Sequence, residues 1–177
     1  MQDQYNNISA WVHRHAGHIP PNSDILDLAC GKGRHARYLA NLGHQITLID
    51  HDLSGVIDLA GDRRFKLIKH DLEHSPWPFA ERSFGGIVVT NYRYPPLYPH
   101  LITALTDNGT LIYDTFAVGN EQYGHPRNPA FLLEPGELLN AFAADLHIVA
   151  YDHGYIGTPK AAIRQRLCAC KNTTRKT

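Results

Sequence analysis

Two glycines and a later carboxylate are the residues whose types and spacing most clearly imply chemistry. Gly31 and Gly33 stand in "DLACGKG", between an apolar run and a helical run, and Asp50 ends the next apolar run. Glycine lets a backbone pass close to a ligand, and a helix that starts at Gly33 presents free amides that favour negative charge. A carboxylate at Asp50 can accept both hydroxyls of a ribose. The pattern therefore predicts a site for a nucleoside cofactor.

Two classes of cofactor fit this turn. Ala36 completes Gly-x-Gly-x-x-Gly/Ala, the pattern of dinucleotide-binding enzymes. Against a dinucleotide, Asp27 lies just before the turn, where a carboxylate would repel a pyrophosphate but suit the ammonium of a cofactor that carries an amino acid. In "HDLE", Asp71 could accept from an adenine amino group while the Leu72 amide donates to the ring. A helix before the first strand and a hairpin at the end of the chain also depart from the usual dinucleotide fold.

The elements that must position these residues alternate along the chain. Strands are expected at residues 25–29, 45–50, 65–69, 86–90 and 110–116, and helices at residues 33–42, 54–60, about 97–105 and from Pro135 onward. The turn residues 107–109 separate a helix from a strand, and residues 117–133 are too irregular to form an element. Residues 146–155 and 161–170 leave no room for a helix between them, so they should form an antiparallel hairpin.

This order predicts an α/β fold: a Rossmann-like, doubly wound sheet of seven strands, mostly parallel, with an antiparallel C-terminal hairpin strand. Ligands of such sheets bind beyond the carboxyl ends of the strands. Gly31, Asp50, Asp71, Asn91 and the segment after Phe116 should therefore share one rim.

Composition limits the class of protein. Residues 1–177 suit a single domain, with an N-terminal helix inside residues 1–20 that could act as a lid and a basic tail at residues 171–177. Seventeen basic and seventeen acidic residues make a nucleic-acid partner unlikely on charge. We expect no membrane span, no signal peptide and a cytoplasmic protein. Cys168 and Cys170 alternate along a strand without a second ligand pair, so no metal is expected.

At this point the chain resembles the class I S-adenosylmethionine (SAM)-dependent methyltransferases. The resemblance rests on "DLACGKG", "LID", "HDLE" and "GGIVVTNY", in this order, and it spans essentially the whole chain. The segments "PWPF" and "DTFAVGNEQYGHPRNPAFLLEPGELL" resemble the small bacterial tellurite-resistance-type and related small-molecule methyltransferases. One departure is Gly85, because relatives commonly have Asp after the corresponding Phe. This position usually supports structure, so local stability is in question more than cofactor binding.

The resemblance implies SAM as cofactor and assigns roles residue by residue. For the cofactor, the resemblance assigns backbone packing at the turn to Ala29, Gly31 and Gly33, and contact with the methionine end to Asp27. Ribose binding is assigned to Asp50, adenine contacts to His51, Asp71 and Leu72, and a rim contact to Asn91. The main alternatives are that Asp27 only caps the turn, that Asp50 is an exposed acid at a strand end and that His51 is a solvated loop residue.

The acceptor pocket is predicted from the residues that follow the fourth and fifth strands. Arg93, Tyr123, His125 and Arg127 are the candidates, and two arginines there would suit an anionic acceptor, although surface arginines fit the sequence equally well. Methyl transfer to a small molecule guarantees no catalytic residue, because a base is needed only if the acceptor must lose a proton. The competing functions are a non-catalytic nucleotide-sensing or interaction module and an NAD(P)-dependent oxidoreductase.

Overall fold

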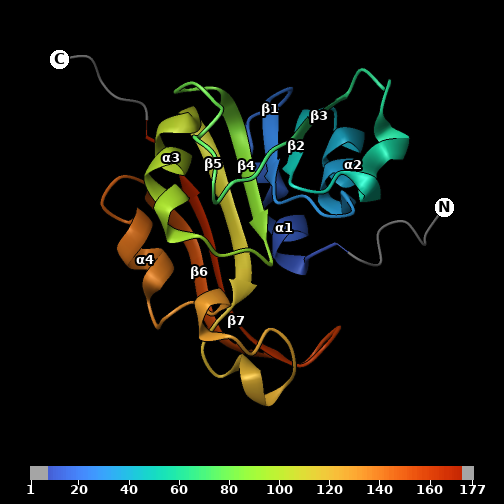
Figure 1. The fold of residues 1–177 in the computed structure, drawn as a ribbon. Helices are drawn as coiled ribbons and strands as arrows, with labels where there is room; N and C mark the ends of the chain where they lie inside the picture. The colour runs from blue at the N-terminus through green and yellow to red at the C-terminus, as the bar shows by residue number, and fades with distance from the viewer. Residues whose placement is uncertain (1–7, 173–177) are drawn as a thin grey trace.

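The structure, a computed structural model, describes residues 8–172 and contains one seven-stranded sheet (Figure 1). The strand order is β3-β2-β1-β4-β5-β7-β6. The strands are β1 (Asp24–Leu28), β2 (Gln45–Asp50), β3 (Phe65–Lys69), β4 (Phe84–Thr90), β5 (Leu105–Phe116), β6 (His147–Ile156) and β7 (Ala162–Cys170). The α-helices are α1 (Ala10–His15), α2 (Arg34–Asn41), α3 (Tyr98–Ala104) and α4 (Glu137–Phe142). Residues 1–7 and 173–177, parts of the predicted lid and basic tail, lie outside the described residues.

The pairing directions confirm the predicted fold class. β1 pairs in parallel with both β2 and β4, β2 pairs in parallel with β3, and β4 pairs in parallel with β5. β7 runs antiparallel to both β5 and β6, so the C-terminal hairpin closes one side of the sheet. β4 has no exposed residue, as expected for a parallel strand that is covered on both faces.

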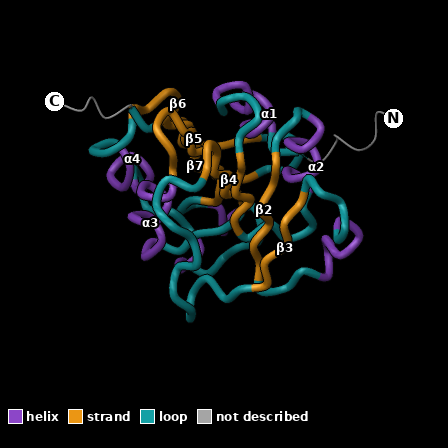
Figure 2. Tube along the Cα trace, turned by 90° about the horizontal axis from the view of Figure 1, so that it is seen from above, coloured by secondary structure: helices purple, strands orange, loops and turns teal. Residues whose placement is uncertain are grey.

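Helices cover both faces of the sheet (Figures 1 and 2). On one face, α1, α2 and the 3-10 segment η3 (Ser54–Leu59) pack through Val12, Leu39 and Val56. On the other face, α3 and α4 pack through Leu101 and Phe142. The sheet is therefore doubly wound. Among the described residues, no helix is long and apolar enough to cross a membrane.

Two predicted boundaries were wrong for local reasons. Residues 107–109 do not precede the fifth strand but lie inside β5, where the register slips from Phe84↔Leu105 to Gly86↔Thr110 and Asn108 adopts φ 60°. The predicted turn is thus a bulge. α4 begins at Glu137, two residues after Pro135, because Gly136 is left-handed. The short helix predicted at residues 54–60 is present as a 3-10 helix over residues 54–59.

Gly85, the departure from the family pattern, has a packing reason. A Cβ atom at Gly85 would lie 2.3 Å from Ser23 Oγ and 2.7 Å from Ser23 Cβ. Ser23 is itself held, because its hydroxyl donates to Pro20 O at 2.5 Å and its amide donates to His44 Nδ1 at 3.3 Å. The serine therefore occupies the volume that a side chain on β4 would need.

We expect Gly85→Ala to lower the free energy of unfolding by about 1–3 kcal/mol, the cost of overpacking a filled site. Urea denaturation followed by circular dichroism measures this change. Gly17→Ala is the matched control, because a Cβ there would meet no atom within 4 Å. The double variant Gly85→Ala with Ser23→Gly should recover part of the loss. Equal stabilities for Gly85→Ala and Gly17→Ala would contradict the packing explanation.

Candidate active site

In the turn after β1, every second residue is left-handed. Ala29 has φ 54°, Gly31 φ 54° and Gly33 φ 65°. A Cβ atom at Gly31 would meet nothing within 4 Å, whereas one at Gly33 would lie 2.6 Å from Val56 Cγ1. The two glycines therefore have different roles. Gly31 faces open space, where a ligand can approach the backbone, and Gly33 lets η3 pack against the start of α2.

Asp50 closes this open space from the neighbouring strand. Its Oδ2 accepts a hydrogen bond from the Gly31 amide at 2.9 Å. Its Oδ1 accepts from the Asp52 amide at 3.1 Å and lies 2.9 Å from His51 Nδ1. The carboxylate is buried, so it is fixed in direction, and Oδ2 has a second lone pair for a ribose hydroxyl. A buried acid that faces an open glycine turn fits an adenosine cofactor.

Asp27 makes a capping contact, the role that the sequence analysis gave as the alternative to cofactor binding. Gly33 is the N-cap residue of α2 but has no side chain to cap the helix, and Asp27 Oδ2 accepts a hydrogen bond from the Ala36 amide at 3.1 Å instead. Asp27 is completely buried, and burial raises the pKa of its carboxyl to about 7. Its contact with the methionine end of a cofactor stays a prediction.

The expected adenine residues lie at the ends of neighbouring strands, mostly exposed. Asp71 Oδ1 accepts from the amides of Glu73 at 2.9 Å and His74 at 3.1 Å, and these bonds hold the pKa of its carboxyl below the usual value. Leu72 is buried in the core beside this turn. The His51 side chain is 82% exposed, and its contact with Asp50 is the one that holds it among the described residues. The turn is therefore held by its own hydrogen bonds, and the adenine contacts remain predictions.

Asn91 joins this cleft to a second space. It follows β4 in a left-handed conformation, its amide donates to Asp114 O at 3.0 Å and its Oδ1 accepts from Arg164 Nη2 at 2.7 Å. Asp114 lies in β5 and Arg164 in β7. The side chain at the predicted rim position thus connects three adjacent strands.

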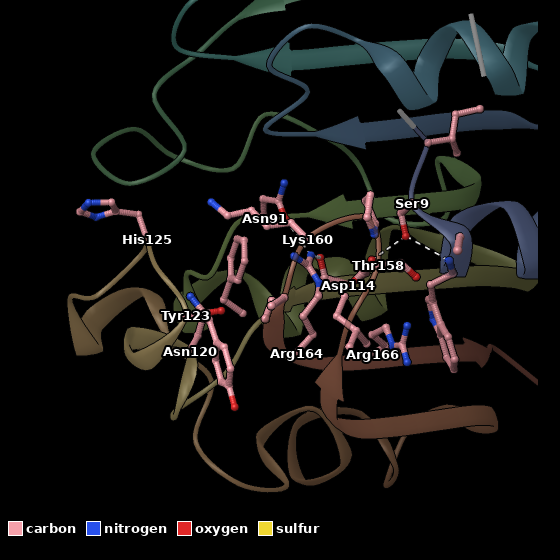
Figure 3. Close-up of a pocket in the computed structure, with 18 of the residues that line it drawn as sticks. Ser9, Asn91, Asp114, Asn120, Tyr123, His125, Thr158, Lys160, Arg164 and Arg166 are labelled. Atoms are coloured by element: carbon pink, nitrogen blue, oxygen red, sulfur yellow. Dashed lines mark hydrogen bonds and ion pairs between the residues drawn. The ribbon is translucent and has the colours of Figure 1, made fainter. Parts of the chain in front are cut away.

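A cavity of about 370 Å³ opens next to Asn91, between α1, the ends of β5 and β7 and the segment 117–133 (Figure 3). Its size falls in the range of small-molecule sites. Its lining combines aromatic, aliphatic and charged residues: Ile8, Ser9, Ala10, Trp11, Arg34, Asn91, Asp114, Phe116, Asn120, Tyr123, His125, Ile156, Thr158, Pro159, Lys160, Ala161, Ala162, Arg164 and Arg166.

Two of the four predicted pocket residues line this cavity, and the two arginines do not. Tyr123 and His125 are part of its wall, although His125 lies apart from the arginines (Figure 3). Arg93 instead forms an ion pair with Glu137 at 2.9 Å, and its Nη1 donates to Ala130 O at 2.8 Å. Placing Arg93 and Arg127 at this cavity was wrong. The guanidinium of Arg93 is used to fasten α4 to the end of β4.

Arg164 and Arg166, two of the cavity's charged residues, were missed because they belong to β7. Arg164 donates from Nε to Asp114 Oδ1 at 2.6 Å and from Nη2 to Asp114 O at 2.9 Å, and both side chains are nearly buried. Arg166 pairs with Asp152. The alternation in "AIRQRL" puts both arginines on one face of a strand. That signal was present in the sequence, but it does not show which face meets the site.

The N-terminal segment covers the cavity and is tied to its floor. The Ser9 hydroxyl donates to Asp114 Oδ2 at 2.5 Å, and the Ser9 amide donates to His35 Nε2 at 3.2 Å. Burial lowers the pKa of His35 to about 3, so the ring is neutral and Nε2 can accept. The Ser9 oxygen also accepts from Trp11 N and Val12 N, which caps α1. These bonds support the expectation that the N-terminal helix is a cover, and a lid motion stays a prediction.

Comparisons with known proteins agree with this geometry. Residues 25–107 match the family model described as a methyltransferase domain. The structure is similar to TehB from Haemophilus influenzae, with a TM-score of 0.76 and 19% identity over 93% of this chain and 63% of that chain. It is also similar to 1,6-didemethyltoxoflavin-N1-methyltransferase from Burkholderia thailandensis, whose structure holds its substrate and S-adenosylhomocysteine (SAH), with a TM-score of 0.70 and 19% identity over 97% and 80% of the two chains.

A third similar structure, a SAM-dependent methyltransferase from Mesorhizobium loti, gives a TM-score of 0.71 and 15% identity over 92% of this chain and 98% of that one. The chain spans less than two thirds of the length of TehB. No curated protein matched the sequence.

The fold is that of the α/β methyltransferases of known structure, and residues 25–107 match a methyltransferase-domain model. These comparisons agree with the SAM-dependent enzyme class and the cofactor that the sequence predicted. Its seven-stranded mixed sheet is the sheet of its structural neighbours. Among residues 8–172, no group of three or more potential ligands could hold a metal ion.

We expect Gly31→Ala to weaken SAH binding about tenfold or more, because the new methyl group enters the space that a cofactor needs. Isothermal titration calorimetry measures the affinity. Gly61→Ala is the matched control, because Gly61 also has a positive φ, 92°, and equally open surroundings. Gly61→Ala therefore introduces the same kind of backbone strain, from a side chain at positive φ, but outside the cofactor cleft. If both variants bind SAH alike, Gly31 does not face the cofactor.

We also expect the free energy of unfolding to fall as pH rises from about 4 to 7, because folded Asp27 holds a proton that the unfolded chain releases. Above pH 7 both states are ionised and this contribution stays constant. Asp27→Asn removes the titration, and the difference from wild type in urea denaturation should therefore change across this window. Asp58→Asn, at an exposed ion pair, is the control. The same pH profile for wild type and Asp27→Asn would contradict the assignment.

Proposed function

We propose that this protein transfers a methyl group from SAM to a small-molecule acceptor that binds in the cavity beside Asn91. The observation that carries the proposal is the pairing of Asp50 with Gly31 at 2.9 Å, next to open space at Gly31. These residues suit the adenosine part of the cofactor. The cavity includes Arg34, which follows the glycine turn, and lies at the ends of β4 and β5, where an acceptor could reach the sulfonium.

The cofactor supplies the chemistry: its sulfonium methyl passes to a nucleophile in line, and the S–C electron pair returns to sulfur to give SAH. The protein's part is to align the two molecules and keep water out. The Gly31 backbone and Asp50 position the cofactor. Asn91, fixed by Arg164, forms part of the wall of the acceptor cavity. Ser9 and Trp11 cover that cavity.

No side chain needs to be assigned as a base. Asp114 is the carboxylate in the cavity wall, and both its oxygens already accept, from Arg164 and from Ser9. An acceptor whose nucleophile is a thiolate or an oxyanion loses no proton and needs no base. The geometry therefore suits alignment of an ionised nucleophile better than proton abstraction.

The small size of the acceptor is supported by the cavity. A volume of about 370 Å³, covered by Ile8 and Trp11, suits a small molecule better than a nucleic acid or a protein segment. The Burkholderia thailandensis neighbour is itself a small-molecule methyltransferase. A nucleotide-sensing module would need the cleft but not this second cavity, so the cavity favours the enzyme.

We expect Asp50→Ala to weaken SAH binding by about 1.5–3 kcal/mol, the range for hydrogen bonds to a charged group. Calorimetric titration of the folded protein measures the change. Asp62→Ala is the control, because Asp62 pairs with Arg64 on the exposed surface. Absence of SAH binding by wild-type protein would refute the proposed function. Unchanged affinity in Asp50→Ala would refute the ribose contact alone.

A further inference from the structure

The acceptor cavity carries an excess of positive charge. Its wall contains Arg34, Lys160, Arg164 and Arg166 but a single carboxylate, Asp114. Asp114 pairs with Arg164, and Arg166 pairs with Asp152 outside the wall. Lys160 forms no hydrogen bond or ion pair with any residue in the described part of the chain. A cavity partly shielded from water with this imbalance attracts an anion.

Arg164 is held in a fixed direction with donors left over. A guanidinium has five N–H donors. Nε donates to Asp114 Oδ1, and Nη2 donates to Asn91 Oδ1 at 2.7 Å and to Asp114 O at 2.9 Å. The guanidinium also stacks 4.3 Å from the centre of the Phe116 ring. Both hydrogens on Nη1 have no partner among residues 8–172, so this buried side chain has two preoriented donors for a ligand.

The positive charges lie at the cavity wall that the cofactor turn does not reach. Arg164 and Arg166 come from β7, and Lys160 comes from the loop between β6 and β7 (Figure 3). Arg34 instead follows the glycine turn directly, as the first residue of α2. The β7 group is therefore available to a second molecule.

The rest of the wall is apolar. Ile8 and Trp11 cover one side, and Phe116 and Ile156 form another. Trp11 packs under the Arg166 guanidinium, 5.1 Å from the ring centre. A bare inorganic anion would leave these side chains facing unfilled space. An organic molecule would use both the charges and the apolar walls.

We propose that the methyl acceptor is a small organic anion: a carboxylate bound by Arg164 Nη1 and Lys160, on an aromatic or aliphatic body that packs against Trp11 and Phe116. The anion is the group by which the acceptor is recognised. The inference rests on the proposed function, since it names the acceptor class of the same site.

The experiment compares matched acids and amides. SAH-saturated protein is titrated with benzoate and benzamide, phenylacetate and phenylacetamide, and indole-3-acetate and indole-3-acetamide, and also with inorganic phosphate. We expect at least one carboxylate to bind about tenfold or more tightly than its amide, the effect of one strong charged contact. Lys160→Gln and Arg164→Lys should each remove most of this preference, and Lys66→Gln, on an exposed position of β3, should keep it.

Each other outcome has a definite meaning. If SAH binds normally and no carboxylate exceeds its amide, the acceptor class is wrong while the proposed function stands. If SAH itself does not bind, the proposed function fails. If Lys160→Gln and Arg164→Lys weaken SAH and not the carboxylates, these cations hold the cofactor's own carboxylate and the inference is overturned. If phosphate binds as tightly as every carboxylate, the organic body is wrong.

Discussion

The hydrogen bond from the Gly31 amide to the Asp50 carboxylate is the contact on which the site depends. It joins the turn after β1 to the end of β2, and it can form only because these strands are parallel neighbours with Leu28 beside Ile49. A buried carboxylate must be hydrogen-bonded, so the bond also fixes the direction of Asp50. Without this hydrogen bond, nothing else described at Gly31 would fix its backbone in front of the open space.

The acceptor cavity depends on a different feature, the antiparallel insertion of β7 between β5 and β6. The register pairs Asp114 with Arg166 and Phe116 with Arg164. Because β7 runs the opposite way to β5, its first residues meet the last residues of β5, and the arginines arrive at the same rim as the cofactor turn. A parallel strand in this place would bring its end, not its beginning, to the rim. The reversed strand thus brings two arginines to the acceptor cavity.

The cofactor half of the site could be predicted from sequence, and the acceptor half could not. Gly31 and Asp50 lie at the ends of successive strands, so local pattern and the rule for parallel sheets place them together, and β2 and β3 have the predicted bounds. Arg93 also follows a strand, but its side chain forms an ion pair with Glu137 in α4, 44 residues further along the chain, and so does not line the cavity. Arg164 reaches the cavity only through the register of β7, which no local pattern specifies.

Ser9 has a practical consequence. It bonds the floor of the cavity at Asp114, and Ile8, the first described residue, is itself part of the wall. Substitutions at Ile8 or Ser9 would therefore change the mouth of the acceptor cavity as well as the start of α1. Cys170 is paired with Thr110 at the far end of β5, away from both ligand spaces. The first and the last described residues of the chain therefore lie toward opposite ends of β5.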